Sequence, residues 1–359
     1  MRWQAVDALA LRQLAMGAAV LSAGGGSFPY LELLSAEEAL QSASPAPLIP
    51  ASHLPNDARV ALVAMVGAPL ALAERLVDPE HFARPVAALA KHLGKSFDAV
   101  MGYEIGSMNS LIPAMVATRV GLPLVDADTL GRSFPEIQMS AFAIAGLDMA
   151  PMAISDIRAT NLIVTEVATG RWMESLLRSI ATTCGAILAV CGCHTGRQIK
   201  QHAHLGSYSR AIRIGAAILS AQARRTDPVA ALLSAERGAV LARGKVCDVI
   251  RNTTDGFVRG QVDIDIGTPT PVCVHFQNEY TLVAVGGHPL AMVPDLIVVL
   301  DAERGEPLGT EALRYGQHVV VARMPALESH LTPQALAVLG PRAFGYDFDY
   351  DSKNPEAPQ

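Results

Sequence analysis

The chain has 359 residues, of which 50% are hydrophobic and 17% are charged, and its formal net charge is −6 at pH 7. This length suggests two domains, and the apolar content excludes an intrinsically disordered chain. The acidic balance, with no basic run carrying interleaved aromatic residues, argues against a nucleic-acid partner. The best interior apolar run, residues 60–73, is too short for a membrane span and contains Gly67 and Pro69. We therefore expect no membrane partner.

The N-terminus has some features of a signal peptide, but Asp7 lies where a basic region would be, and the apolar residues around it follow a helical period. Five cysteines are an odd and sparse set, unlike a secreted disulfide framework. We therefore predict a cytoplasmic protein. A homo-oligomer would cover part of the large apolar content.

Helical and strand patterns alternate along residues 1–165, the first predicted domain. The first helix ends at the triple glycine Gly24, Gly25 and Gly26. Short apolar strands between helices predict an α/β layered domain with a mainly parallel sheet. The predicted helices are 4–22, 32–41, 70–76, 82–93 and 110–120, and the predicted strands are 59–66, 99–103 and 122–126.

The pattern changes in the second predicted domain, residues 166–343. A helical segment comes first, with helices over 171–181 and 207–223 and a strand over 185–190. From 239 to 321 the helical period gives way to β-branched residues, alternation and a turn at Asp255-Gly256, so we expect a β-rich C-terminal domain. Residues 344–359 form a predicted polar tail.

Charged residues at the ends of apolar strands are the main candidates for catalysis. Glu104 directly follows a strand, at the edge where α/β sheets collect ligands. Asp126 and Asp128 point to one face of an extended segment and suit metal binding or paired acid–base work, and Arg132 lies close enough in sequence to position them. For Glu104, the alternative is a structural charge that interacts favourably with the N-terminus of the next helix. For the aspartates, the alternative is a buried structural network of Asp and Arg side chains.

Two further groups are candidates for substrate binding. The run Gly24, Gly25 and Gly26 allows a ligand to approach the backbone closely, or it simply ends a helix. Asn109 lies in the turn after Glu104, while Asn278 and Glu279 interrupt an apolar strand and need partners if they are buried. Asn278 and Glu279 either bind a substrate amide or make hydrogen bonds to the backbone at a bulge.

A cluster of soft and nitrogen donors suggests zinc. Cys193 and His194 are followed by His202 and His204, and thiolate and imidazole are the usual zinc ligands. The spacing matches no closed structural site, so we expect an open catalytic Zn²⁺ site with a bound water. The alternative is core cysteines and solvated loop histidines, or Cys193 as a nucleophile with an aspartate as base.

Seven segments of the chain together carry a resemblance to a known family: SAGGGSFP, EIGSMNS, VDADTLGRSFPEIQM, KVCDVIRNTTDGFVRG, FQNEYTLVAV, VPDLIVVLD and TEALRYG. They resemble the bacterial and archaeal family named for S-methyl thiohydantoin desulfurase. The resemblance implies an α/β N-terminal domain, a β-rich C-terminal domain, and hydrolysis at C2 of an S-methylated thiohydantoin to a hydantoin and methanethiol, in the breakdown of S-methylated thiohistidine betaines. Some relatives accompany hydantoinase or oxoprolinase-type enzymes, so the alternative is a non-catalytic binding or regulatory partner of such a complex.

Overall fold

The computed structural model describes residues 5–67, 78–254 and 257–351. They belong to two compact units. Unit 1 comprises Met1–Ala15, Pro29–Gly131 and Glu136–Ile212, and unit 2 comprises Met16–Phe28, Arg132–Pro135 and Arg213–Gln359. Among the described residues, no helix is long and apolar enough to cross a membrane.

A mixed sheet, with seven strands in the described part of the chain, forms the centre of unit 1. The first four strands in its order pair in parallel. The other pairings are antiparallel. Because β8 is antiparallel to both β2 and β6, these two strands run in the same direction. The mainly parallel sheet that the sequence predicts is thus confirmed. The order is β1 (Leu48–Ile49), β4 (Leu124–Val125), β3 (Ala99–Gly102), β2 (Arg59–Gly67), β8 (Ile187–Thr195), β6 (Met152–Asp156) and β7 (Asn161–Val164).

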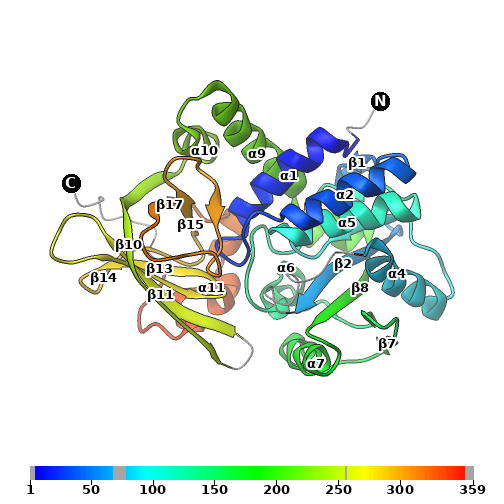
Figure 1. The fold of residues 1–359 in the computed structure, drawn as a ribbon. Helices are drawn as coiled ribbons and strands as arrows, with labels where there is room; N and C mark the ends of the chain where they lie inside the picture. The colour runs from blue at the N-terminus through cyan, green and yellow to red at the C-terminus, as the bar shows by residue number, and fades with distance from the viewer. Residues whose placement is uncertain (1–4, 68–77, 255–256, 352–359) are drawn as a thin grey trace. The chain divides into compact units, whose positions relative to one another are not determined.

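Helices cover both faces of this sheet (Figure 1). On one face, α4 (Pro79–Leu93) and α5 (Met108–Val120) contact each other and the strands. On the other, α7 (Gly170–Thr183) packs its buried residues Met173 and Leu177 into an apolar core with Leu62 and Val190. The remaining helices that begin in unit 1 are α1 (Ala8–Leu21), α2 (Tyr30–Ser42), α6 (Ala141–Ile144), α8 (Gly196–His202) and α9 (Ser207–Arg224), and a two-stranded sheet pairs β5 (Ala127–Asp128) with β9 (His204–Leu205).

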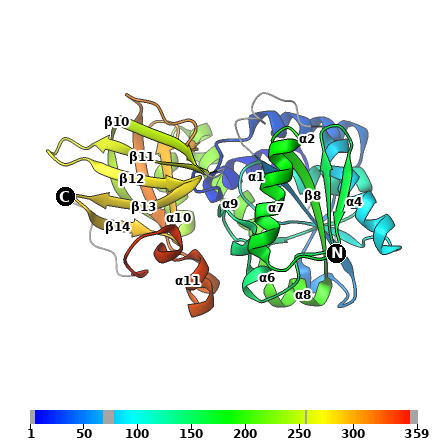
Figure 2. The ribbon, with the colours of Figure 1, turned by 90° about the horizontal axis from the view of Figure 1, so that it is seen from below.

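Unit 2 contains an antiparallel sheet, with eight strands among the described residues, which confirms the predicted β-rich C-terminal domain (Figure 2). Every pairing in it is antiparallel, and one face carries an apolar core that includes Val262, Val274 and Tyr280. The helices are α10 (Pro228–Glu236) and α11 (Pro333–Leu339), and the sheet order is β14 (His288–Met292), β13 (Glu279–Val285), β12 (Val272–Gln277), β11 (Phe257–Asp265), β10 (Ala239–Thr254), β17 (His318–Met324), β15 (Leu296–Asp301) and β16 (Pro307–Leu308).

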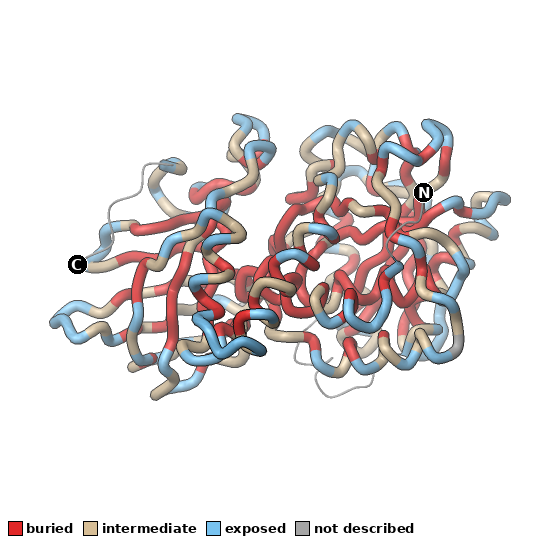
Figure 3. Tube along the Cα trace, turned by 90° about the horizontal axis from the view of Figure 1, so that it is seen from above, coloured by how far each residue is buried: buried red, intermediate tan, exposed pale blue. Residues whose placement is uncertain are grey.

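The central strands of both units are largely buried, and so are long stretches of α1 and α5 (Figure 3). Short 3₁₀ turns complete the described elements at Ala51–His53, Ile137–Met139, Glu328–Leu331 and Pro341–Phe344.

The observed elements agree with the sequence patterns in order and type, and differ mainly at their ends. The helix predicted over 82–93 begins earlier, at Pro79, because Asp78 accepts a hydrogen bond of 2.9 Å from the Glu80 amide and so caps it. The strand predicted over 185–190 continues to Thr195. The helix predicted over 70–76 and the turn at Asp255-Gly256 lie outside the described residues.

The described part of the predicted tail has a folded structure. Tyr346, Phe348 and Tyr350 pack against Leu282 and Met292 of the sheet. The intervening aspartates point away from these contacts, because Asp347 and Asp349 pair with Arg342. The alternation of aromatic and acidic residues therefore gives this segment a strand-like division into a packed side and a charged side.

Candidate active site

The carboxyl ends of the parallel strands of unit 1 meet at one edge of the sheet, and Glu104 lies there, in the turn between β3 and α5. Its Oε2 accepts a hydrogen bond of 2.9 Å from Nδ2 of Asn109. The same amide bridges to β2, because Nδ2 donates to the Met65 carbonyl at 3.3 Å and Oδ1 accepts from the Met65 amide at 2.8 Å. Glu104 is partly exposed, whereas Asn109 is buried. Asn109 therefore fixes an accessible carboxylate to the sheet.

Asp128 lies beneath the same turn and is completely buried. Its Oδ2 accepts hydrogen bonds from the amides of Ile105 (3.1 Å), Leu130 (3.1 Å) and Gly131 (2.9 Å). Its Oδ1 has no hydrogen-bond partner among the described residues. Burial raises the pKa of Asp128 to about 7, against the opposing effect of the amides, and the charge of Glu104 raises it further. The structure thus brings Glu104, Asn109 and Asp128 together.

Asp126 has a different role from Asp128. It lies in the bend between β4 and β5, and its carboxylate accepts from the amide of Ser209 at 3.0 Å and from the Ser209 hydroxyl at 2.5 Å. This pairing satisfies the start of α9, as an acidic capping residue does. The alternative that the sequence left open was a buried structural network, but Asp126 is partly exposed and its partner is Ser209.

Arg132 also makes structural contacts, and these lie within unit 2. Its guanidinium donates to the carbonyl of Asp295 and, through Nε, to the Ser133 carbonyl at 3.0 Å. The guanidinium carbon lies 4.7 Å from the centre of the Phe134 ring, at the distance of a cation–π contact. Arg132 is 2% exposed, so these contacts compensate a buried charge.

The four predicted zinc ligands do not fit one ion. Cys193 and His194 are neighbours in β8 and therefore point to opposite faces of the sheet. They pair with Ala61 and Val60, near the amino end of β2 and hence at the edge opposite Glu104. Among the described residues, no group of three or more His, Cys, Asp or Glu side chains has the arrangement of a metal site.

The two other histidines come from further elements, and His202 is near enough to His194 for its charge to add to the effect of burial in lowering the pKa of that imidazole. His202 ends α8, and His204 stands opposite Asp128 in the β5–β9 pairing. Burial lowers the pKa of His204 to about 4, and it does the same for His194, whose ring packs edge-on against Phe142. Both imidazoles are therefore neutral at pH 7.

The glycine run packs against the β12–β13 hairpin of unit 2. A Cβ on Gly24, whose φ is +91°, would lie 2.5 Å from the Tyr280 ring, and one on Gly25 would lie 2.3 Å from a carboxylate oxygen of Glu279. Asn278 has a φ of 58°, and its side chain accepts from the Val258 amide at 2.9 Å. These residues make close packing contacts with one another within unit 2.

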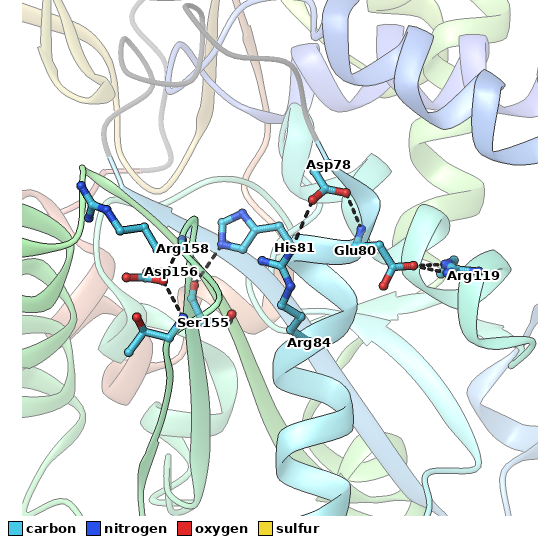
Figure 4. Close-up of polar contacts among 9 residues, drawn as sticks. Asp78, Glu80, His81, Arg84, Arg119, Ser155, Asp156 and Arg158 are labelled. Atoms are coloured by element: carbon cyan, nitrogen blue, oxygen red, sulfur yellow. Dashed lines mark hydrogen bonds and ion pairs between the residues drawn. The ribbon is translucent and has the colours of Figure 1, made fainter.

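Sequence analysis missed a second polar group at the carboxyl edge, around His81 at the start of α4 (Figure 4). Its Nε2 lies 3.0 Å from the carbonyl of Ser155 in β6, and burial lowers the pKa of the imidazole. Beside it, Arg84 pairs with Asp78 at 3.5 Å. A pocket of about 470 Å³ opens along α4 and includes Arg84 but none of the Glu104 group. We interpret these contacts as attaching α4 to β6.

Sequence analysis also missed Ser107 and Tyr208. Ser107 precedes α5 with φ 41° and ψ −128°, a region that residues other than glycine rarely adopt. The Tyr208 hydroxyl is buried with no hydrogen-bond partner among the described residues, and it lies 2.6 Å from where a Cβ on Gly102 would be. The GYEIG sequence places a glycine at that position, but no local pattern reveals its distant partner.

Comparisons with known proteins bear on the whole chain. The model of the S-Me-THD-like N-terminal domain matches residues 9–166, and that of the S-Me-THD-like C-terminal domain matches residues 168–353. The chain belongs to the S-methyl thiohydantoin desulfurase family. A search of curated proteins gave no match. A crystal structure of a protein from Chromobacterium violaceum has a TM-score of 0.80, with 21% identity over 96% of this chain and 98% of that chain, which shows a shared fold.

Proposed function

We propose that this member of the family is a hydrolase that cleaves the C2–S bond of an S-methyl thiohydantoin. The products are a hydantoin and methanethiol, and the reaction belongs to the breakdown of S-methylated thiohistidine betaines. Family membership supports the class of reaction. The observation that carries the assignment to this site is the partly exposed Glu104 carboxylate, held by Asn109 above the buried Asp128.

The chemistry needs a group that takes a proton from the attacking hydroxyl. The C2 carbon of the substrate is bonded to two nitrogens and one sulfur, so it is an amidine-like electrophile. Attack on it gives a tetrahedral intermediate, which expels methanethiolate. Glu104 accepts the proton of the attacking O–H group and returns it to the leaving sulfur. Asn109 keeps the carboxylate oriented through the 2.9 Å hydrogen bond.

Asp128 supports this site through its hydrogen bond to the turn that carries Glu104. Its pKa of about 7 means that its charge changes near neutral pH. Because its Oδ2 accepts from the Ile105 amide, that charge acts directly on the turn that carries Glu104. Asp128 is thus a positioning residue, and its protonation state alters the field at Glu104. The mechanism uses no zinc, because the four candidate ligands do not converge.

The test is product formation by the purified full chain. Incubation with S-methyl thiohydantoins that differ in their ring substituent should release methanethiol, measured with a thiol reagent, and hydantoin, measured by mass spectrometry. Glu104→Gln serves as the matched variant, because it keeps an acceptor for Asn109. Release of neither product from any substrate, together with co-purification of a hydantoinase-type hydrolase, would instead support the binding or regulatory role.

A further inference from the structure

Resting on the proposed function, we infer that Ser107 is the nucleophile of the reaction. Its Oγ attacks C2 and holds the ring as a covalent intermediate, which water then hydrolyses. The inference identifies the hydroxyl whose proton Glu104 accepts.

The backbone of Ser107 is the first observation. With φ 41° and ψ −128°, Ser107 adopts a conformation that is sterically unfavourable for a residue with a Cβ. Glycine would adopt it without this cost, and glycine already precedes it as Gly106. A serine is therefore present where the backbone alone favours glycine, which points to a requirement for its hydroxyl.

The position of Ser107 in the fold is the second observation. It lies between the strand β3 and the helix α5, at the carboxyl edge of the sheet. A strained serine in a strand-to-helix turn is also how α/β-hydrolases present a nucleophile, although here the turn is longer, since β3 ends at Gly102. The Ser107 side chain makes no capping hydrogen bond to α5. Its conformation is thus not explained by helix capping.

The surroundings of Ser107 hold the turn firmly. After it, the Ser110 hydroxyl donates to the Ser107 carbonyl at 2.7 Å. Before it, the Ile105 amide donates at 3.1 Å to Asp128, which is completely buried. The fold therefore fixes the unfavourable conformation from both sides, as pre-organisation of a reacting group requires.

The third observation is the nearby carboxylate. Glu104 precedes Ser107 by three residues in the same turn, and Asn109 follows it by two. The side chains of Glu104 and Asn109 are joined by a 2.9 Å hydrogen bond across this segment. A nucleophilic hydroxyl needs an adjacent base, and Glu104 provides one within the turn.

The reaction balances with water as its only co-reactant. The Ser107 hydroxyl gives its proton to Glu104 as the Oγ–C2 bond forms. The C2–S bond then breaks, and methanethiolate takes that proton and leaves as methanethiol. Water next gives a proton to Glu104 and adds to C2, after which the C2–Oγ bond breaks and Oγ recovers the proton. The products are hydantoin and the original serine.

Cys193 fits this role less well. Burial raises the pKa of its thiol, which reduces the thiolate fraction at neutral pH. It also lies near the amino edge of the sheet, opposite Ala61 of β2.

The test uses three replacements of Ser107 in the full chain. Ser107→Ala removes the hydroxyl and keeps the strain, Ser107→Gly removes both, and Ser107→Cys substitutes a thiol. Ser155→Ala is the control, because Ser155 is a completely buried serine of β6, outside the turn that carries Ser107. The measurements are methanethiol release, resistance to urea, and the intact mass after acid quenching of a single turnover.

We expect release to fall by about 10³-fold or more in Ser107→Ala and Ser107→Gly, and by less than about tenfold in Ser155→Ala. Ser107→Gly should resist urea at least as well as the wild type, which separates lost chemistry from lost folding. The wild type should carry the ring, less methanethiol, on the peptide that contains Ser107. In Ser107→Cys one equivalent of methanethiol should be released as a burst, because the resulting thioether-type adduct resembles the substrate.

Two results would overturn the inference. If the wild type releases methanethiol and Ser107→Ala retains a rate within tenfold of it, the hydrolase function stands and Ser107 is not its nucleophile. If the wild type releases no methanethiol from any of the substrates, the proposed function is wrong and the assignment of Ser107 is wrong with it.

Discussion

The amide of Ile105 donates a 3.1 Å hydrogen bond to Oδ2 of Asp128. A completely buried carboxyl group in β5 thereby holds the turn that follows β3, in which Glu104 and Ser107 both lie. This hydrogen bond connects Asp128, whose pKa is raised to about 7, with the turn that carries the partly exposed carboxylate of Glu104. It gives the proton on Asp128 a consequence for both stability and activity.

Asp128→Asn should change how stability depends on pH. Burial raises the pKa of Asp128 from 3.8 to about 7, so the folded protein binds this proton more tightly than the unfolded chain. Its contribution to stability is full below about pH 4, falls as the pH rises towards 7, and changes no further above that. The variant lacks this titration. The unfolding free energy of Asp128→Asn minus that of the wild type should therefore increase with pH, by at most about 1.4 kcal/mol per unit, and level off above pH 7. Urea unfolding at several pH values measures it, and a difference independent of pH would contradict it.

Glu104→Gln should abolish most of the activity and leave the fold intact. Glutamine still accepts the hydrogen bond from Asn109 but cannot take a proton, so kcat should fall by about 10²–10⁴-fold. Because Glu104 is partly exposed, the urea midpoint should change little. Glu80→Gln in α4 is the control, since Glu80 pairs with Arg119 outside the site. Equal activity of the two variants would remove Glu104 from the mechanism.

Gly24→Ala should destabilise unit 2 through a steric clash. Gly24 has φ +91°, and an added Cβ would lie 2.5 Å from the Tyr280 ring. Gly267→Ala is a matched control, because Gly267 has φ +80° and nothing lies within 4 Å of the added Cβ. Both variants carry the cost of a positive φ, and only Gly24→Ala should add about 1–3 kcal/mol for the clash. Urea unfolding of the two variants measures the difference. Similar losses would show that the ring moves aside freely.

The sequence predicts the fold well, because the segments that become buried are rich in apolar residues. Buried strands are continuous apolar runs, and helices show apolar residues at a helical period. The strands 59–66 and 99–103 are continuous apolar runs, and β2 and β3 are indeed buried within the sheet. The extension of β8 through Cys193 and His194 was not predicted. Its glycine and polar residues indicate a loop locally, yet pairing with Val60 and Ala61 of β2 makes them a strand.

The candidate site was predictable only in part. Glu104 and Asp128 follow from their places at the ends of strands. Asn109 was predicted in the turn after Glu104, but it belongs to α5, which begins at Met108. The partners of the others come from distant parts of the chain. Asp126 pairs with Ser209, and Arg132 donates to the carbonyl of Asp295, contacts separated by 83 and 163 residues. The strain at Ser107 is a property of the folded backbone, since serine itself gives no indication of a positive φ.

Cys193→Ala and His202→Ala should keep the activity within about threefold of the wild type. The two side chains belong to different elements, β8 and α8, and neither belongs to the Glu104 group. If a zinc ion held by both were needed, each variant would lose activity and zinc together. Elemental analysis of protein purified without chelator, paired with methanethiol release, measures both quantities. Parallel loss of zinc and activity in the two variants would restore the zinc hypothesis.

Tyr208→Phe should leave the protein as stable as the wild type or more stable. The hydroxyl of Tyr208 is completely buried and has no hydrogen-bond partner among the described residues, so it is desolvated without compensation. Its removal should raise the unfolding free energy by about 1 kcal/mol. Tyr280→Phe is the control, because Tyr280 is equally buried but donates a 2.8 Å hydrogen bond to the Leu308 carbonyl. That variant should lose about 1 kcal/mol. Urea unfolding of both proteins decides the matter, and a loss of stability in Tyr208→Phe would show that its hydroxyl is hydrogen-bonded in solution.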